Sequence, residues 1–131
     1  MIMAKVLIWA TGNFFIFYGV VFALFPAEAA VFVTDGSPDT TSALIDMRAT
    51  YGGMSIAVGA TILLLGSRPE LLDFALLVTG VILLGMAAGR TLGIVIDGEP
   101  NTVMYLYLVA EVLSGVTALA LRHTVKSDRA P

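Results

Sequence analysis

Four long stretches of apolar residues dominate the sequence, and short polar segments separate each from the next. They cover residues 6–25, 41–66, 70–96 and 102–121. The hydrocarbon core of a bilayer is about 30 Å thick and is crossed by roughly 20 helical residues. Each stretch is therefore long enough to span a membrane. The pattern predicts an all-α fold, an integral membrane antiparallel four-helix bundle, with residues 1–131 forming a single transmembrane domain.

The segments between these stretches contain residues typical of loops and helix ends. The longest, residues 26–40, predicts a loop on the outer face, with residues 27–33 in the membrane interface. Gly98 suits the end of the third helix, and Pro100 prevents that helix from continuing. The first apolar stretch is longer than the core of a signal peptide, which has about 7–15 residues, so we expect it to be retained as a span.

Composition and the placement of charge support a membrane location. Hydrophobic residues make up 58% of the chain and charged residues 13%, whereas a soluble domain is roughly 45–50% apolar and about 25% charged. The basic residues outside the spans fall at one face, namely Lys5, Arg68, Arg122, Lys126 and Arg129. The opposite face is acidic, with Glu28, Asp35, Asp39, Asp97 and Glu99. The positive-inside rule then predicts a multi-pass membrane protein with N- and C-termini cytoplasmic.

Several kinds of chemistry lack the residues that they need. The chain has no cysteine and a single histidine, His123, near its C-terminus. The acidic residues show no recognisable ligand spacing, so we expect no metal site and no cofactor. No basic stripe runs along any segment, and we expect no nucleic-acid partner.

The charged residues Arg48, Arg90 and Glu111 lie well inside the predicted spans. A rise of 1.5 Å per residue places them about 9–15 Å below the outer ends of their helices. Because helical side chains tilt toward the N-terminus of their own helix, Arg90 and Glu111 converge from adjacent antiparallel helices, and we predict an ion pair between them. The same tilt directs Arg48 outward, where its expected partners are lipid headgroups or Asp46, Asp97 and Glu99.

These charges and neighbouring polar side chains form what we call the charge cluster, defined as Arg48, Tyr51, Arg90, Asp97, Tyr107 and Glu111. In one interpretation the charges neutralise one another and fix the register of the helices. In the other, two arginines near one glutamate leave hydrogen-bond donors free for an anionic or carbonyl-bearing ligand. Glu111 is the candidate catalytic residue, because a carboxylate without a partner in a dry cavity can act as a general acid.

Small residues recur at every fourth position on three of the predicted spans. They are Ser55 and Gly59 on the second span, Gly85, Gly89 and Gly93 on the third, and Ala110, Ser114 and Ala118 on the fourth. Such ridges allow helices to approach closely in lipid. We expect them to pack within the bundle, with a dimer interface as the alternative.

Several short motifs occur between the second span and the fourth. They are the run Arg48-Ala49-Thr50-Tyr51-Gly52-Gly53, then Gly89-Arg90 with Gly93, then Asp97-Gly98 with Pro100, and finally Glu111. Together they resemble a bacterial four-span membrane protein family of unknown function, of the domain of unknown function 4345 type. The resemblance implies that Arg48, Tyr51, Gly52, Gly53, Arg90, Asp97 and Glu111 match the signature positions of that family. It implies no activity.

We therefore expect a non-catalytic inner-membrane protein that binds a lipid or another hydrophobic ligand, or serves as an accessory subunit, because no nucleophile–base pair or nucleotide-binding loop is present. The alternative is a membrane-embedded enzyme of isomerase or cyclase type, acting on a lipid-soluble substrate with Glu111 as acid/base. Transport ranks below both, since the inner half of the bundle offers little polar relay. The expected partners are membrane lipids, a hydrophobic or anionic small ligand, and a membrane protein.

Overall fold

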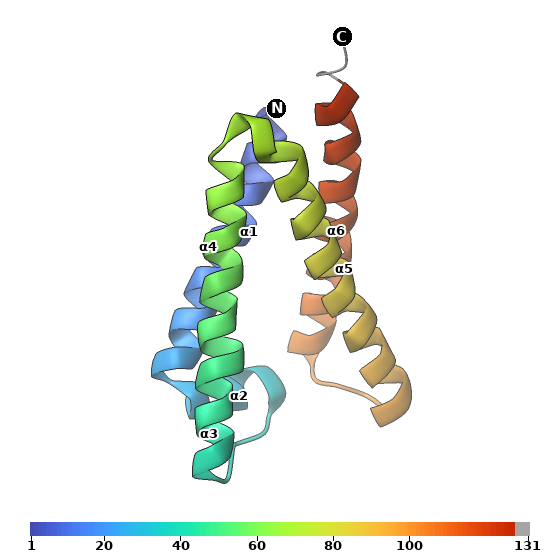
Figure 1. Cartoon of the computed structure of the whole chain (residues 1–131). Helices are drawn as coiled ribbons and strands as arrows, with labels where there is room; N and C mark the ends of the chain where they lie inside the picture. The colour runs from blue at the N-terminus through green and yellow to red at the C-terminus, as the bar shows by residue number, and fades with distance from the viewer. Residues whose placement is uncertain (128–131) are drawn as a thin grey trace.

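The computed structural model describes residues 1–127, which are almost entirely helical (Figure 1). The elements in chain order are α1 (Ile2–Leu24), α2 (Pro26–Thr34), α3 (Thr41–Met47), the π-helix η1 (Arg48–Met54), α4 (Ser55–Gly66), the short 3₁₀-helix η2 (Pro69–Leu71), α5 (Leu72–Asp97) and α6 (Thr102–Ser127). Arg129 lies outside the described residues, as does the side chain of Lys126.

Four helices in the described part of the chain are long and apolar enough to cross a membrane. They are Ile2–Leu24, Thr41–Gly66, Pro69–Asp97 and Thr102–Val125. Many large apolar side chains on them point outward, including Trp9, Phe17, Leu64, Val81, Leu106 and Leu113. Such a surface is stable only against lipid. The predicted all-α transmembrane class is confirmed.

The spans pack as two antiparallel hairpins. In the first hairpin, α1 lies along the continuous helix formed by α3, η1 and α4, and in the second hairpin α5 lies along α6. Figure 1 shows that the hairpins approach at the end carrying both chain termini, the terminal end, and diverge toward the opposite end, the distal end. The bundle is therefore tapered, and its helices are not packed evenly along their length.

Close helix contact within each hairpin depends on glycine. A Cβ atom added to Gly59 would lie 2.5 Å from the backbone oxygen of Gly12, and one added to Gly19 would lie 2.6 Å from the oxygen of Gly52. In the second hairpin, a Cβ atom on Gly115 would lie 2.8 Å from the side chain of Leu84. Lipid tails provide no hydrophobic drive for helix association, so this close approach supplies the packing energy.

The ridge of the third span does not pack as expected. A Cβ atom on Gly85 or Gly89 would meet nothing within 4 Å, and one on Gly93 would meet only a carboxylate oxygen of Asp97, at 3.7 Å. The contacts of α5 with α6 pass through a different face, which carries Gly80. The expectation that this ridge packs inside the bundle is therefore wrong.

Two separate cores hold the hairpins together. At the terminal end, buried apolar side chains from all four spans meet, among them Ala4, Ile8, Ile62, Leu72, Leu76 and Ala118. At the distal end, residues predicted to form a loop fold as α2, whose Ala29, Ala30 and Val33 pack with Phe22 and with α6. The side-chain amide of Asn101 also donates to the Val33 carbonyl at 3.0 Å. The space between these two cores is where the hairpins separate.

Candidate functional site

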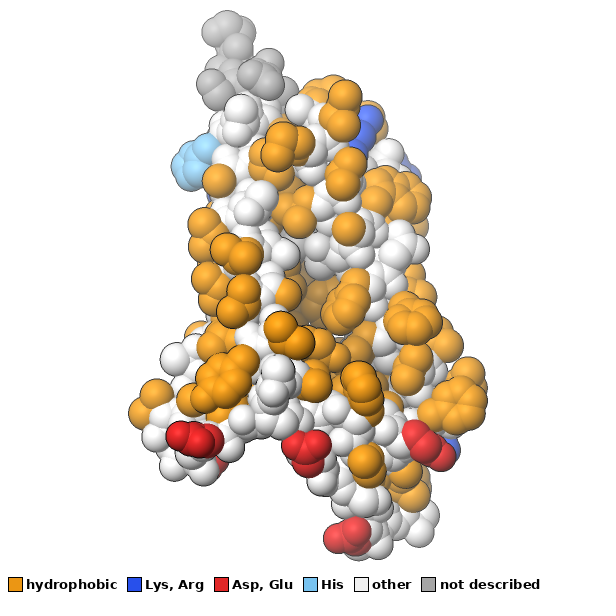
Figure 2. Space-filling model, turned by 180° about the vertical axis from the view of Figure 1, so that it is seen from behind, with side chains coloured by type: hydrophobic (Ala, Val, Ile, Leu, Met, Phe, Trp, Pro, Cys, Tyr) orange, Lys and Arg blue, Asp and Glu red, His pale blue; other side chains and the backbone are white. Residues whose placement is uncertain are grey.

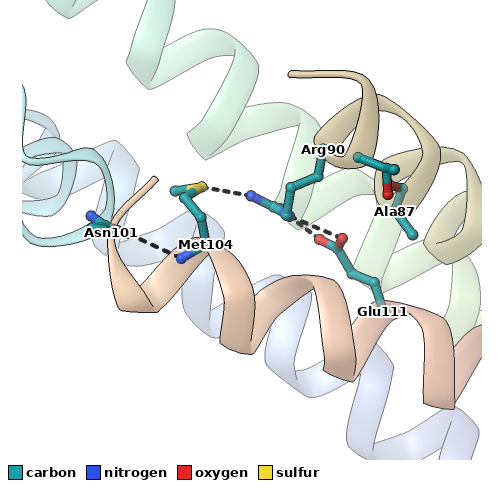
Figure 3. A network of polar contacts seen from close by, with 6 residues as sticks. Ala87, Arg90, Asn101, Met104 and Glu111 are labelled. Atoms are coloured by element: carbon teal, nitrogen blue, oxygen red, sulfur yellow. Dashed lines mark hydrogen bonds and ion pairs between the residues drawn. The ribbon is translucent and has the colours of Figure 1, made fainter. Parts of the chain in front are cut away.

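Arg90 and Glu111 face each other across the second hairpin (Figure 3). The Arg90 Nη2 atom lies 2.6 Å from Glu111 Oε1, and Nε donates to Oε2 at 3.1 Å. This two-point geometry is the strongest form of an arginine–carboxylate contact. Glu111 is only 6% exposed. The predicted ion pair is confirmed, and it uses both carboxylate oxygens.

The outer edge of the Arg90 guanidinium is less well satisfied. Its Nη1 donates to the Met104 sulfur at 2.8 Å, and a thioether is a weak acceptor. The guanidinium carbon lies 5.3 Å from the centre of the Tyr107 ring, within the range of a cation–π contact. A guanidinium has five N–H groups and the carboxylate engages two of its nitrogens, so Arg90 keeps donor capacity for a further acceptor.

A cavity of about 1010 Å³ adjoins this pair. It lies between the hairpins, between the core at the terminal end and α2, and the space-filling surface in Figure 2 is hollowed near its middle. The polar wall includes Tyr18, Tyr51, Ser55, Arg90, Tyr107 and Glu111. The apolar wall includes Leu7, Phe15, Val58, Ile82, Leu83 and Met86. The volume is at the upper end of the range for small-molecule sites, and an apolar wall with few polar groups is typical of them.

Aromatic rings line the cavity beside the ion pair. The Tyr18 ring lies 4.7 Å from that of Phe22 and 6.4 Å from that of Tyr107, and Phe22 stacks on Tyr51 at 5.3 Å. These rings come from α1, η1 and α6, so they connect the two hairpins. A smaller pocket of about 300 Å³, lined mainly by α1 and α2, shares Tyr18, Phe22 and Tyr107 with the main cavity.

The structure brings together four members of the charge cluster and separates two. Tyr51, Arg90, Tyr107 and Glu111 line the cavity, whereas Arg48 and Asp97 are not among its lining residues. Asp97 is exposed at the last position of α5.

The carboxylates expected as partners of Arg48 are wrong, and a lipid headgroup as its partner stays a prediction. Its Nη1 donates to the backbone carbonyl of Ala23, and to that of Leu24 at 3.3 Å. The carbonyls of the last turn of a helix have no partner within the helix, and Gly52 brings this end of α1 against η1, because a Cβ there would lie 3.0 Å from Ala23 Cα. Unsatisfied carbonyls were thus closer to Arg48 than the acidic residues.

Sequence reasoning missed two features of the site. The first is η1, a π-helical segment of 7 residues that places Tyr51 beside Phe22. Such segments within α-helices are frequent at functional sites. The second is Met104, which lies seven residues before Glu111 and so shares its helix face. The spacing can be seen in the sequence, but methionine is apolar and therefore did not suggest a contact with a charged group.

Fold and site together define a multi-pass α-helical membrane protein with a buried ion pair on the wall of a largely apolar cavity. The described residues contain no group of His, Asp and Glu side chains arranged to hold a metal ion. The sequence matches the family described as Domain of unknown function (DUF4345) over residues 3–122, and the chain belongs to that family. No curated protein and no solved structure matches it.

Proposed function

We propose that this protein binds an amphipathic, lipid-soluble ligand in the cavity between its hairpins and does not transform it chemically. The observation that carries the proposal is the cavity of about 1010 Å³, apolar over most of its wall and bordered by Arg90 at one place. A ligand tail fits the apolar wall, and the free donor edge of Arg90 suits a polar head. Membrane lipids are the nearest source of such molecules.

The state of Glu111 favours binding over catalysis. Both of its oxygens already accept hydrogen bonds from Arg90, so a substrate would have to break the pair before it could exchange a proton with the carboxylate. Separating such a pair leaves a charge uncompensated in an apolar setting, at a cost of about 3–5 kcal/mol. The isomerase or cyclase alternative rests on the position of Glu111 in the cavity wall. It predicts that Glu111→Gln leaves binding intact and abolishes conversion of the bound molecule.

Native mass spectrometry of the purified protein in a gentle detergent tests the proposal. The wild type should carry a bound lipid-soluble molecule whose mass is lost in Gly89→Leu, because Gly89 lines the cavity and a side chain there has room to fill it. Gly85→Leu is the matched control: it lies one turn away, has equally open surroundings and does not line the cavity. A ligand-free wild type would overturn the proposal, and a protein subunit in place of a lipid would favour the accessory role.

We also propose that the terminal end faces the cytoplasm and that the host membrane is the bacterial inner membrane. Lys5, Arg68 and Arg122 belong to the terminal end, and acidic side chains gather at the distal end in Figure 2. The chain contains no cysteine, so a single introduced cysteine is the one thiol that a maleimide can label. A membrane-impermeant maleimide should label Ser37→Cys in intact cells and leave Ser67→Cys unlabelled until the cells are opened. The reverse pattern would invert the orientation.

A further inference from the structure

We infer that the ligand has an uncharged, flat, carbonyl-bearing ring as its head and an apolar tail, which is the chemistry of a quinone. This inference rests on the proposed function and narrows it from amphipathic molecules in general to one class. Four features of the cavity carry it: its charge balance, its unused donors, its aromatic wall and the position of its apolar wall.

The cavity has no net charge to offer an anion. Among the lining residues, all within the described part of the chain, Arg90 and Glu111 are the only charged ones, and they neutralise each other. Arg48, which would have supplied a second positive charge, is bonded instead to the carbonyls of Ala23 and Leu24. A carboxylate or phosphate head would therefore bring an uncompensated charge into an apolar space, whereas a neutral head avoids that cost.

The polar groups left over can all donate hydrogen bonds. The Nη1 edge of Arg90 has only the Met104 sulfur as partner. Tyr18 and Tyr107 also line the cavity, and neither hydroxyl forms a hydrogen bond with another group in residues 1–127. A carbonyl oxygen accepts from such groups and needs no charge to do so. A molecule with carbonyls on a ring can meet the arginine and a tyrosine at once.

The wall beside these donors is aromatic. Tyr18, Phe22 and Tyr107 line it together with Tyr51, and neighbouring ring centres in this group lie 4.7–6.4 Å apart. Rings at this spacing pack against another flat ring in offset-stacked or edge-on geometry. A planar head is therefore matched by shape, which would not hold for the tetrahedral phosphate of a phospholipid.

Apolar side chains continue the cavity toward the terminal end. The cavity is lined there by Leu7, Val58, Ile82 and Leu83. These side chains belong to the core at the terminal end or pack against it, whereas Arg90 does not. A hydrocarbon tail placed against them gains burial without needing any polar partner. Head and tail would then occupy different parts of one cavity.

A comparison of two probes with the same alkyl tail tests the inference on the full-length protein in nonionic detergent. One probe is an alkyl benzoquinone and the other is the fatty acid of matching chain length, with binding measured by native mass spectrometry. We expect the quinone to bind at least about tenfold more tightly, a factor that corresponds to about 1.4 kcal/mol. Equal or tighter binding of the fatty acid would overturn the inference while leaving the proposed function standing. Binding of neither probe, together with a ligand-free wild type, would remove both.

A charge substitution sharpens the test. Glu111→Gln leaves Arg90 without a counter-charge, so the fatty acid should gain about tenfold or more in affinity while the quinone changes little. If Glu111→Gln does not fold, Arg90→Met with Glu111→Leu is the second variant, because it removes both charges and the donor edge. The quinone preference should then shrink, because the arginine donor is gone while the aromatic wall and the tyrosine hydroxyls remain. An undiminished quinone preference in this double variant would overturn the role given to Arg90.

Discussion

The two ends of the molecule are held together by different kinds of contact. At the terminal end, apolar side chains from all four spans interlock, with Ile8, Ile62, Leu72 and Leu76 almost fully buried. At the distal end, the hairpins meet through α2, aromatic rings and the hydrogen bond from Asn101 to Val33. In lipid, small residues that face each other close the bundle, and small residues that face away leave it open. The cavity lies between the closely packed terminal end and the more open distal end.

Breaking the charge balance in the middle of this arrangement should have the largest effect. Glu111→Leu leaves the Arg90 guanidinium uncompensated in an apolar setting, and we expect a loss of about 3–5 kcal/mol in the free energy of unfolding. Unfolding of the detergent-solubilised protein by dodecyl sulfate, followed by circular dichroism, measures it. Arg90→Met combined with Glu111→Leu should recover most of the loss, and a double variant as unstable as the single one would contradict this account.

Crowding the close contact within the first hairpin should come next. Gly59→Leu forces a side chain against the backbone oxygen of Gly12, where even a Cβ atom would lie at 2.5 Å. Overpacking of this kind costs roughly 1–3 kcal/mol, and the rigid backbone neighbour favours the upper part of that range. The same unfolding assay applies. Gly85→Leu should leave stability almost unchanged, and similar losses in both variants would show that glycine content, not helix contact, matters.

Removing the polar contact at the distal end should have a smaller effect. The Asn101 side chain accepts from the Met104 amide at 3.0 Å, as an N-cap of α6, and donates to the Val33 carbonyl. Asn101→Ala removes both bonds and should cost about 1–2 kcal/mol in the same assay. Asn101→Asp keeps the cap and loses the donor, so it should fall between wild type and Asn101→Ala. An aspartate variant as unstable as the alanine variant would place the whole effect in the contact between hairpins.

The smallest change is expected on α5, at Thr79. This side chain is fully buried and its hydroxyl has no hydrogen-bond partner, so Thr79→Val should be neutral or should stabilise by up to about 1 kcal/mol. Thr91→Val is the matched control, because the Thr91 hydroxyl donates to the Ala87 carbonyl at 2.8 Å. Thr79→Val should therefore have a higher free energy of unfolding than Thr91→Val. The opposite order would contradict the conclusion that the Thr79 hydroxyl has no hydrogen-bond partner.

Much of the fold could be predicted because the spans are long and their hydrophobicity is strong. The ion pair between Arg90 and Glu111 could also be predicted, since two charges at similar depth on sequential antiparallel helices have few other partners. Both predictions depend only on distances along a helix, which follow directly from the number of residues between two positions.

The rest depended on how each helix is rotated about its own axis. Gly59 and Gly89 carry the same local signal, yet one touches α1 and the other faces open space. In lipid both orientations of such a helix are apolar, so the hydrophobic pattern does not choose between them. The backbone partner of Arg48 escaped prediction for a related reason: carbonyls at a helix end occur in every sequence and leave no mark in the residue pattern.

The pairing of each intramembrane arginine within its own hairpin has a consequence for biosynthesis. Arg48 is satisfied by Ala23 and Leu24 of the first hairpin, and Arg90 by Glu111 of the second. Each arginine therefore has its partners as soon as its own hairpin has been synthesised. Each pair of helices can therefore leave the translocon with its intramembrane arginine already bound to acceptors of the same pair, and the two pairs then join in the bilayer.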